Sequence, residues 1–371
     1  MNRTRLTILT CSALALVYLA LMGGWLWQRY RVEHAHVRWS LEAGPMQHTQ
    51  HGVSDDGTVL LCADSGVIAL SPRGRELWRC PYSAQSPWVC YEPVPGGGII
   101  ICQTTYDYAS QSTALTGSMY LIRPDGLIEW EMPFDFDGNF QGNNVTAELS
   151  LFLDGRMLAA HSLRDGRRAW TVETGGTHDN IWPQVDSAGN TYFTTLGNEL
   201  VSVSPEGEVR WRTAIPDCAS ALPAVSGACV IYLATADGLL HAIGDDGQER
   251  WQRQLGPPGG GGYIHYAEPR SAANSHGTVC VVSELNGLYV YASDGRLQCT
   301  YEGLLRSPTA PAISDEGMVY VQDLDGLIAI GPDGQVLWRN ATLSETQAQP
   351  QLGPDGTLYV MHEDTLYALG P

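Results

Sequence analysis

The chain has 371 residues, with 21 Lys and Arg against 40 Asp and Glu, and its formal net charge is −19 at pH 7. All 21 of the Lys and Arg residues are arginines, and a chain without lysine cannot form a lysine Schiff base or supply the lysine of a phosphate-binding loop. The negative charge argues against nucleic-acid binding, which requires neutralised phosphates. It leaves two interpretations open: solubility, or attraction of a basic partner surface or a cation.

The first 36 residues differ from the rest of the chain. After a tail of residues 1–5, residues 6–27 are almost continuously apolar, long enough to cross a bilayer as a helix. The stretch exceeds the core of a usual signal peptide and lacks a clear small-x-small cleavage site. We therefore predict a retained transmembrane anchor over residues 6–27 and a linker over residues 28–36. Arginines lie on both sides of this stretch, so charge does not set its orientation.

A phrase that starts at Gly and ends four residues later, usually at Trp, recurs seven times between residues 74 and 338. Repeats of about 40 residues that contain strands and turns are typical of β-propellers. We expect the repeated Trp to pack between neighbouring sheets rather than stack on a cofactor. The pairs are Gly74 with Trp78, Gly126 with Trp130, Gly166 with Trp170, Gly207 with Trp211, Gly247 with Trp251, Gly295 with Cys299, and Gly334 with Trp338.

Residues 315–338 show the plan of one unit. Short apolar runs at 318–321, 327–330 and 335–338 are separated by turns that contain Asp-Gly, which is a hairpin signal. A fourth, inner strand should precede each unit, as near residues 221–225. The last unit stops before its outer strand, and residues 37–40 are in register to supply it. We predict an all-β, eight-bladed β-propeller over residues 37–371, closed by pairing of its N- and C-terminal strands.

The units resemble the pyrroloquinoline-quinone-type repeat family. Their endings match its Asp-Gly-x-x-x-Trp pattern, and residues 238–243 (GLLHAI) and 326–330 (GLIAI) match its strand core. The family contains quinoprotein dehydrogenases and smaller non-enzymatic propellers, such as the lipoprotein of the outer-membrane β-barrel assembly machinery, which is similar in length and blade count. The resemblance implies a propeller outside the cytoplasm, in the cell envelope.

The enzyme branch commonly has two adjacent cysteines, and some members carry a Cys-x-x-Cys-His haem motif; this sequence has neither. We therefore expect no catalytic residues, no cofactor and no metal, and we predict a scaffold that binds a protein partner. Two alternatives stay open: a quinone- and calcium-dependent dehydrogenase, and a sensor that binds a ligand or carbohydrate.

A candidate site lies at the mouth of the central channel. Counting back from the first Gly of each blade aligns eight inner-strand residues, and we expect the three glutamates among them to point into one funnel with the glutamines and Trp182. Such carboxylates would hold a cation or an amine, unless they only line a water-filled channel. The aligned residues are Gln50, Glu92, Glu148, Trp182, Leu222, Glu268, Ala310 and Gln349.

Two units are longer than 40 residues, and their extra loops carry aromatic side chains. Loops with Tyr on a rigid scaffold are candidate contact surfaces, although they can also be surface excursions without a role. The predicted contacts are Tyr106, Tyr108, Tyr263, His265 and Tyr266.

Two further patterns each allow two interpretations. Oxygen-bearing side chains alternate at Asp135, Asp137, Asn139 and Asn143, as in a calcium loop or in an Asx-rich turn. Among the cysteines, Cys80 with Cys90 and Cys218 with Cys229 could form disulfides in an oxidising compartment, or they are buried free thiols.

Overall fold

The computed structural model describes most of the chain after residue 35. The predicted membrane span lies outside the described residues, and within them no helix is both long enough and apolar enough to cross a membrane. The described ranges are residues 36–43, 50–63, 66–81, 88–105, 114–137, 141–154, 156–175, 182–218, 221–255, 270–283, 287–303, 305, 310–323, 325–343 and 349–370.

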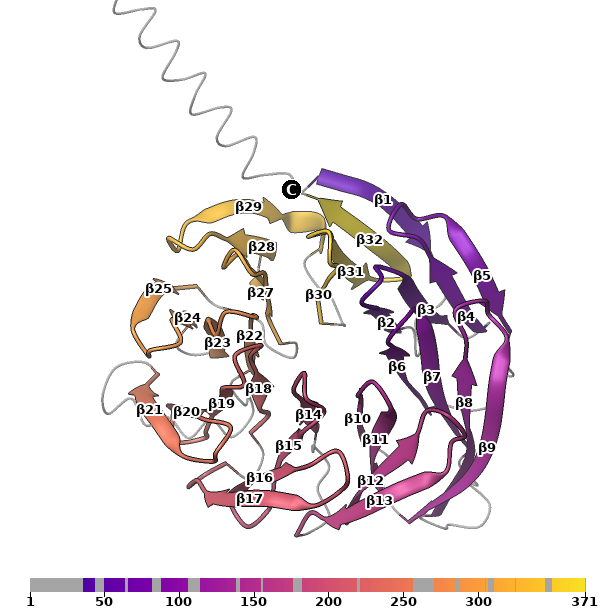
Figure 1. The fold of residues 1–371 in the computed structure, drawn as a ribbon. Helices are drawn as coiled ribbons and strands as arrows, with labels where there is room; N and C mark the ends of the chain where they lie inside the picture. The colour runs from indigo at the N-terminus through magenta and orange to yellow at the C-terminus, as the bar shows by residue number, and fades with distance from the viewer. Residues whose placement is uncertain are drawn as a thin grey trace, which may run out of the picture.

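These residues form eight antiparallel, four-stranded sheets arranged as the blades of a ring (Figure 1). In each blade the strands follow one another from the centre to the rim. The strands of blades 1 to 4 are β2 (Gln50–Val53), β3 (Val59–Ala63), β4 (Gly66–Leu70), β5 (Glu76–Cys80); β6 (Trp88–Val94), β7 (Gly98–Thr105), β8 (Ala114–Ile122), β9 (Ile128–Asp137); β10 (Gln141–Val145), β11 (Leu149–Asp154), β12 (Met157–Ser162), β13 (Arg168–Glu173); and β14 (Gln184–Val185), β15 (Thr191–Thr194), β16 (Glu199–Val203), β17 (Val209–Ala214).

Blades 5 to 8 repeat the plan, and the last one draws its outer strand from the start of the described chain. Their strands are β18 (Ala224–Val225), β19 (Ile231–Ala234), β20 (Leu239–Ile243), β21 (Glu249–Gln254); β22 (Arg270–Ala273), β23 (Val279–Ser283), β24 (Gly287–Tyr291), β25 (Leu297–Tyr301); β26 (Ala312–Ile313), β27 (Val319–Asp323), β28 (Gly326–Ile330), β29 (Val336–Asn340), with the short 3-10 helix η1 (Ala341–Leu343) after it; and β30 (Gln351–Leu352), β31 (Leu358–His362), β32 (Thr365–Gly370), β1 (His36–Glu42).

The ring is closed as predicted. Each inner strand contacts the inner strand of the next blade, and β30 contacts β2. At the rim of blade 8, β1 pairs antiparallel with β32, so that Trp39 lies opposite Ala368 and Leu41 opposite Leu366. Arg38 adds a side-chain link, because its Nη1 donates to Thr357 Oγ1 at 2.6 Å and lies 3.3 Å from Asp355 Oδ2.

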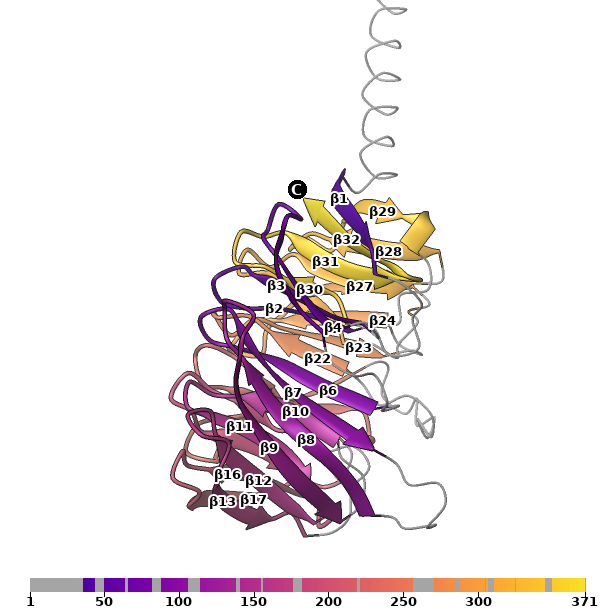
Figure 2. The same cartoon turned by 90° about the vertical axis from the view of Figure 1, so that its right-hand side faces the viewer.

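The two middle strands of each blade form the core. All five residues of β3 and of β4 are buried, because neighbouring blades cover both faces of these strands. The outer strands instead alternate between exposed and half-buried residues, as in β17. The chain therefore buries its apolar middle strands between blades and leaves the outer strands partly exposed at the rim. Figure 2 shows the ring of blades turned by 90° from Figure 1.

The Gly–Trp phrase joins neighbouring blades. Gly207 of blade 4 has a φ of +89°, and a Cβ placed on it would lie 2.5 Å from Cγ of Trp170 in blade 3. Only glycine allows both the turn and this close approach. Trp170 Nε1 also donates to the Pro205 carbonyl of the same turn at 2.8 Å. This contact confirms the structural role predicted for the repeated Trp.

The same docking recurs around the ring. Trp Nε1 donates to a carbonyl in the next outer turn at Trp39 with Pro72, Trp130 with Leu163, Trp211 with Asp245, and Trp251 with Ser293, at 2.7 to 2.9 Å. Trp78 packs on Gly126 without such a bond within the described part of the chain, and Cys299 packs on Gly334.

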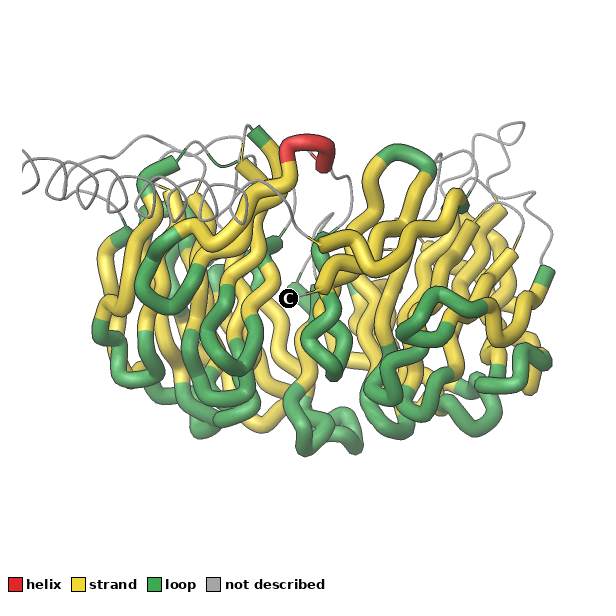
Figure 3. Tube along the Cα trace, turned by 90° about the horizontal axis from the view of Figure 1, so that it is seen from above, coloured by secondary structure: helices red, strands yellow, loops and turns green. Residues whose placement is uncertain are grey.

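The alternation of strands sends two sets of turns to one face of the ring. We call this the turn face: it consists of the turns between the first and second strands and between the third and fourth strands of each blade, from residues 54–58 to residues 353–357. The opposite face carries the turns between second and third strands and the connections between blades. Figure 3 shows the two faces from the side.

Candidate functional site

A cavity of about 220 Å³ opens at the channel mouth, between blades 1, 2, 3 and 8. Glu92 of β6, His51 of β2 and Gln351 of β30 supply its main polar groups. Valine and proline side chains form most of the remaining wall. The lining residues are His51, Gly52, Val53, Ser54, Asp55, Glu92, Pro93, Val94, Pro95, Val145 and Gln351.

The inner strands carry residues of different sizes at the level of Glu92, among them Gln184 opposite Tyr192 in blade 4. The residues that occupy the same register are Gly52 opposite Leu60, Glu92 opposite Ile100, and Gln351 opposite Tyr359. Ala224, Ala272 and Ala312 occupy this register in blades 5, 6 and 7. Gly52 has no side chain, so the space beside Glu92 stays open.

Burial sets the charge state of the two titratable groups deepest in the cavity. It raises the pKa of Glu92 to about 8, because the carboxylate loses much of its hydration. It lowers the pKa of His51 to about 4, since the charged imidazolium is disfavoured more than the hydrogen bond between Nε2 and the Tyr359 carbonyl favours it. His51 is therefore neutral at pH 7, whereas Glu92 is close to half-titration near pH 8.

A turn rich in carboxylates forms the outer edge of the cavity. The Gly96 amide of blade 2 donates to Asp55 Oδ1 of blade 1 at 2.9 Å, which joins the two blades. Burial opposes the ionisation of Asp56, but hydrogen bonds from Ser54 and Thr58 outweigh it and lower the pKa of Asp56. None of the lining residues is an arginine.

Among the predicted channel residues that the structure describes, only Glu92 lines this cavity. Glu148 follows β10 and is exposed in the bend before β11, so it does not lie on the inner strand as expected. Gln50 and Gln349 lie at a different level from Glu92, because Gln50 is opposite Cys62, and Gln349 precedes β30. The predicted convergence of the glutamates in one register is therefore wrong for Glu148.

The other predicted residues spread over the molecule or lie outside its described part. Trp182 precedes β14 and is 44 % exposed, while Leu222 and Ala310 precede β18 and β26. Sequence reasoning missed His51, Asp55 and Gln351, although Gln351 lies two residues after the predicted Gln349, on the same side of an extended strand. The predictions for Glu268, Tyr106, Tyr108, Tyr263, His265 and Tyr266 lie outside the described residues and stay predictions.

The alternating oxygen-bearing residues do not all lie in one loop. Asp135 and Asp137 belong to β9, where they pair with Thr116 and Ala114, and Asn143 belongs to β10, while Asn139 lies outside the described residues. The choice between a calcium loop and an Asx-rich turn stays a prediction. Within the described residues, no group of three or more His, Cys, Asp or Glu side chains is placed to hold a metal ion.

The cysteines whose side chains the structure describes form no disulfide bond with one another. Cys218 and Cys229 do not form the disulfide considered above, and Cys80 is also unpaired with sulfur. Burial raises the pKa of the Cys62 and Cys218 thiols, so these side chains behave as small apolar core residues.

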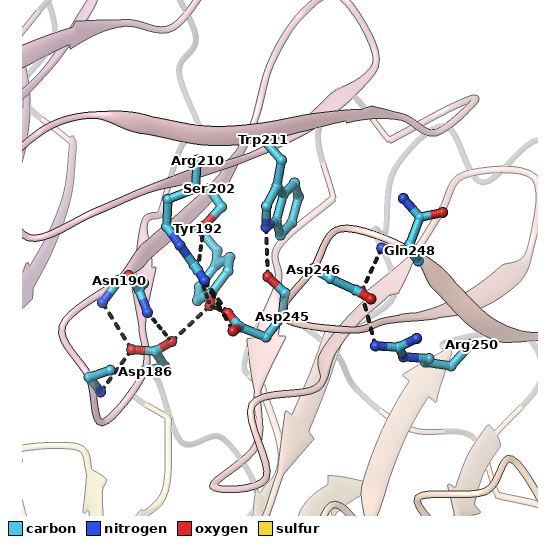
Figure 4. Close-up of polar contacts among 11 residues, drawn as sticks. Asp186, Asn190, Tyr192, Ser202, Arg210, Trp211, Asp245, Asp246, Gln248 and Arg250 are labelled. Carbon is cyan, nitrogen blue, oxygen red and sulfur yellow. Dashed lines mark hydrogen bonds and ion pairs between the residues drawn. The ribbon is translucent and has the colours of Figure 1, made fainter.

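A polar network links blades 4 and 5 at the turn face (Figure 4). The Arg210 guanidinium contacts both carboxylate oxygens of Asp245, at 2.8 and 3.0 Å. The Tyr192 hydroxyl lies between Asp245 Oδ1 and Asp186 Oδ2, at 3.0 and 2.8 Å. The bond from Arg210 is the main reason that the pKa of Asp245 is lowered. Each carboxylate is used within the protein, so the network is structural.

The charges of the turn face are unevenly distributed. In blades 1 to 3 five acidic residues are balanced by five arginines: Asp55, Asp56, Asp125, Glu148 and Asp165 with Arg73, Arg75, Arg123, Arg164 and Arg167. In blades 4 to 8 the turns contain nine exposed acidic residues and one arginine, Arg296, while Arg38, Arg210 and Arg250 on the adjoining strands pair with Asp355, Asp245 and Asp246. These acids are Glu206, Glu208, Asp245, Asp246, Asp294, Asp315, Glu316, Asp333 and Asp355, and we call them the acidic arc.

Comparison with protein families identifies the family to which this propeller belongs. A family model described as "Outer membrane protein assembly factor BamB" matches residues 154–298 and 237–371, which together span more than half of the chain. The chain belongs to this family. It is a PQQ-like repeat propeller close to the BamB branch, as the resemblance of its repeats predicted. No curated protein sequence matches the chain.

Solved structures agree with the propeller fold of this BamB-family chain. BamB from Moraxella catarrhalis is 13 % identical, with a TM-score of 0.63, over 90 % of this chain and 99 % of that one. The designed Ika8 protein is 13 % identical, with a TM-score of 0.65, over 92 % and 98 % of the two chains. The C-terminal WD40 domain of Sif2 is 10 % identical, with a TM-score of 0.64, over 92 % and 99 %. At these identities the likeness establishes the fold alone.

Proposed function

We propose that this chain is a non-catalytic scaffold of the cell envelope, which binds a protein partner through the acidic arc of its turn face. Residues 6–27 would hold the propeller at the membrane, on the side away from the cytoplasm. Membership of a family described as an outer membrane protein assembly factor supports a role in assembling other proteins. The same fold also serves unrelated functions, so the surface must carry the argument.

The uneven charge of the turn face is the observation that carries this proposal. Nine exposed acids on five successive blades face four arginines, of which Arg38, Arg210 and Arg250 pair with Asp355, Asp245 and Asp246. A net negative field remains, whereas the charges of blades 1 to 3 cancel. A field of this kind speeds the encounter with a basic surface and orients it. The partner surface is therefore expected to be rich in lysine and arginine.

The scaffold presents these carboxylates on rigid supports. Asp294 Oδ1 accepts the Arg296 amide at 2.9 Å and Asp333 Oδ1 accepts the Gln335 amide at 3.1 Å, so their turns are fixed before a partner arrives. A surface that is already ordered loses little conformational entropy on binding. Carboxylates held in this way can recognise a basic surface without rearrangement.

Carbodiimide crosslinking in membranes tests the proposal, because this chain contains no lysine. The reagent couples carboxylates to amines, so products of the tagged full chain report lysines of other proteins, apart from the chain's own N-terminus. We expect one dominant partner, captured less efficiently as the salt concentration rises, since screening weakens exposed charge pairs.

A matched pair of variants locates the contact. Combined E206Q, E208Q, D294N, E316Q and D333N substitutions should reduce the crosslinked partner roughly fivefold or more, because they remove rim charges that steer association. Combined D125N, E148Q and D165N substitutions in blades 1 to 3 should leave the yield unchanged. Equal losses in both variants, or no partner at all, would refute the assignment to the acidic arc.

A further inference from the structure

We infer that the cavity at the channel mouth binds an alkylammonium group, with Glu92 as its counter-ion and Gln351 as a second polar contact. This inference goes beyond the proposed scaffold function, because the cavity lies inside the ring, at blades 1, 2, 3 and 8, rather than on the acidic arc. The ligand chemistry is a primary amine on a short hydrocarbon chain, either free or as a lysine side chain.

The first reason to expect a cationic ligand is that the Glu92 carboxylate lacks a partner among the described residues. Within the described residues, no hydrogen bond or ion pair reaches Glu92. Glu92 is half-buried beside the open cavity, whereas the buried carboxylates are fully used: Asp186 accepts four hydrogen bonds, and Asp323 is paired with Arg339 and bonded by the Tyr301 hydroxyl. Removing a carboxylate from water without a partner is costly, so a ligand that restores a partner is favoured.

The lining of the cavity selects a cation. Among the described lining residues, Glu92 and Asp55 are the carboxylates, His51 is held neutral by burial, and none is an arginine. An anion would find no positive group here. Within the described residues no cluster of three or more His, Cys, Asp or Glu side chains is placed to hold a metal ion, and Ca²⁺ takes six to eight oxygen ligands. A single ammonium group, by contrast, is satisfied by a carboxylate and a carbonyl oxygen.

The walls of the cavity select an alkyl chain. Val53, Pro93, Val94 and Val145 line it with apolar surface next to Glu92. A volume of about 220 Å³ holds several water molecules, each of which occupies about 30 Å³ in the liquid, or a chain of a few methylenes. Burying methylenes against these residues adds affinity that a bare ammonium ion or a metal cannot gain.

Protonation of Glu92 couples this binding to pH. Only the ionised carboxylate pairs with an ammonium, and the pKa of Glu92 is raised to about 8. The affinity should therefore rise about tenfold per pH unit below pH 8 and level off above it. The other titratable groups of the lining are His51, which stays neutral above its pKa of about 4, and Asp55. The alkylammonium keeps its charge up to about pH 10.

Calorimetric titration of the full chain with n-butylammonium tests this inference, with 1-butanol as the uncharged control. We expect butylammonium to bind with proton release at pH 7, and butanol at least tenfold more weakly. E92Q should weaken butylammonium binding at least tenfold and abolish the proton release. E148Q, which removes an exposed glutamate from a neighbouring turn, should bind like the unmodified chain.

A second variant keeps the test decisive if E92Q fails to fold. V145F fills the cavity while leaving Glu92 in place, and it should also abolish binding. A peptide with one central lysine distinguishes the two sources: tighter binding than butylammonium indicates a partner side chain, and weaker binding indicates a free amine. Unchanged affinity in E92Q and V145F, or no heat at millimolar butylammonium, would overturn the inference. Partner crosslinking through the acidic arc should be unaffected by E92Q, so the two proposals fail separately.

Discussion

Trp211 and Trp338 occupy the same position on the outer strands of blades 4 and 7, but their contacts with the following blade differ. Trp211 packs 6.0 Å from Tyr192 at an interplanar angle of 42°, and Trp338 packs 6.0 Å from Tyr320 at 41°. Trp211 Nε1 donates to the Asp245 carbonyl in the outer turn of blade 5. Blade 8 has no such turn, because its third and fourth strands, β32 and β1, come from opposite ends of the described chain.

This difference shows what holds the ring together. Between blades 4 and 5, a continuous turn supplies the glycine, the carbonyl and the Asp245 carboxylate that contacts Arg210. At blade 8 the β1–β32 ladder, Arg38 and the packing of Trp39 take the place of the turn. The closing blade therefore depends on pairing between β1 and β32, which are far apart in sequence. Closing this long loop costs more chain entropy than forming a short turn within a blade.

The largest expected effect comes from removing that strand. Replacing residues 36–42 with a Gly-Ser segment of the same length should lower stability by about 5 kcal/mol or more, because Trp39 alone is worth several kcal/mol as a packed aromatic and the ladder is lost with it. Thermal unfolding measures the loss. The exposed edge of β32 should also promote self-association, visible by light scattering. An unchanged unfolding midpoint would mean that β1 does not close the ring.

The sequence predicted this closure because the repeat itself carries the information. The spacing of Gly and Trp marks each outer turn, and the incomplete last unit identified residues 37–40 as the missing strand. Glycine at the turn and Trp at the blade interface serve contacts between successive units. The glycine therefore recurs in every continuous outer turn, and Trp follows it in every such unit except the one that ends at Cys299. The blade count and the role of Trp follow from these contacts.

The register of the inner strands could not be predicted in the same way. Four of these strands, including β14 and β30, have only two residues, which is too short to show an alternation of apolar and polar side chains. The length of the turn that follows each strand therefore fixes its register. That turn has five residues in blade 1 (54–58) but three in blades 2 and 3 (95–97 and 146–148). Counting back a fixed number of residues from the glycine of each blade therefore placed Glu148 on the inner strand, although it lies in the turn. The same count aligned Glu92 with Gln50, although the two residues occupy different registers.

Two glycines with the same backbone conformation but different surroundings allow the cost of a steric clash to be measured apart from the cost of the left-handed backbone. Gly247 in the outer turn of blade 5 has a φ of +76°, and Gly356 in blade 8 has a φ of +77°. A Cβ on Gly247 would lie 2.7 Å from Trp211 Cδ2, whereas nothing lies within 4 Å of one on Gly356. We expect G356A to cost about 1 kcal/mol, from the left-handed backbone alone, and G247A about 3 kcal/mol, from the added clash. Denaturant unfolding of both variants measures this, and equal costs would show that Trp211 yields freely.

The smallest expected effect comes from removing the indole N–H that donates to the outer turn of the next blade, a hydrogen bond that blade 8 cannot accept because it has no such turn. W211F and W338F both keep an aromatic ring against a tyrosine at nearly the same distance and tilt. W211F also leaves the Asp245 carbonyl without its donor, whereas in the described residues Trp338 Nε1 makes no hydrogen bond. W211F should therefore cost about 1 kcal/mol more than W338F in denaturant unfolding. If the two variants lose the same stability, water replaces the indole donor at Asp245, and the boundary between blades 4 and 5 rests on packing and on the ion pair of Arg210 with Asp245.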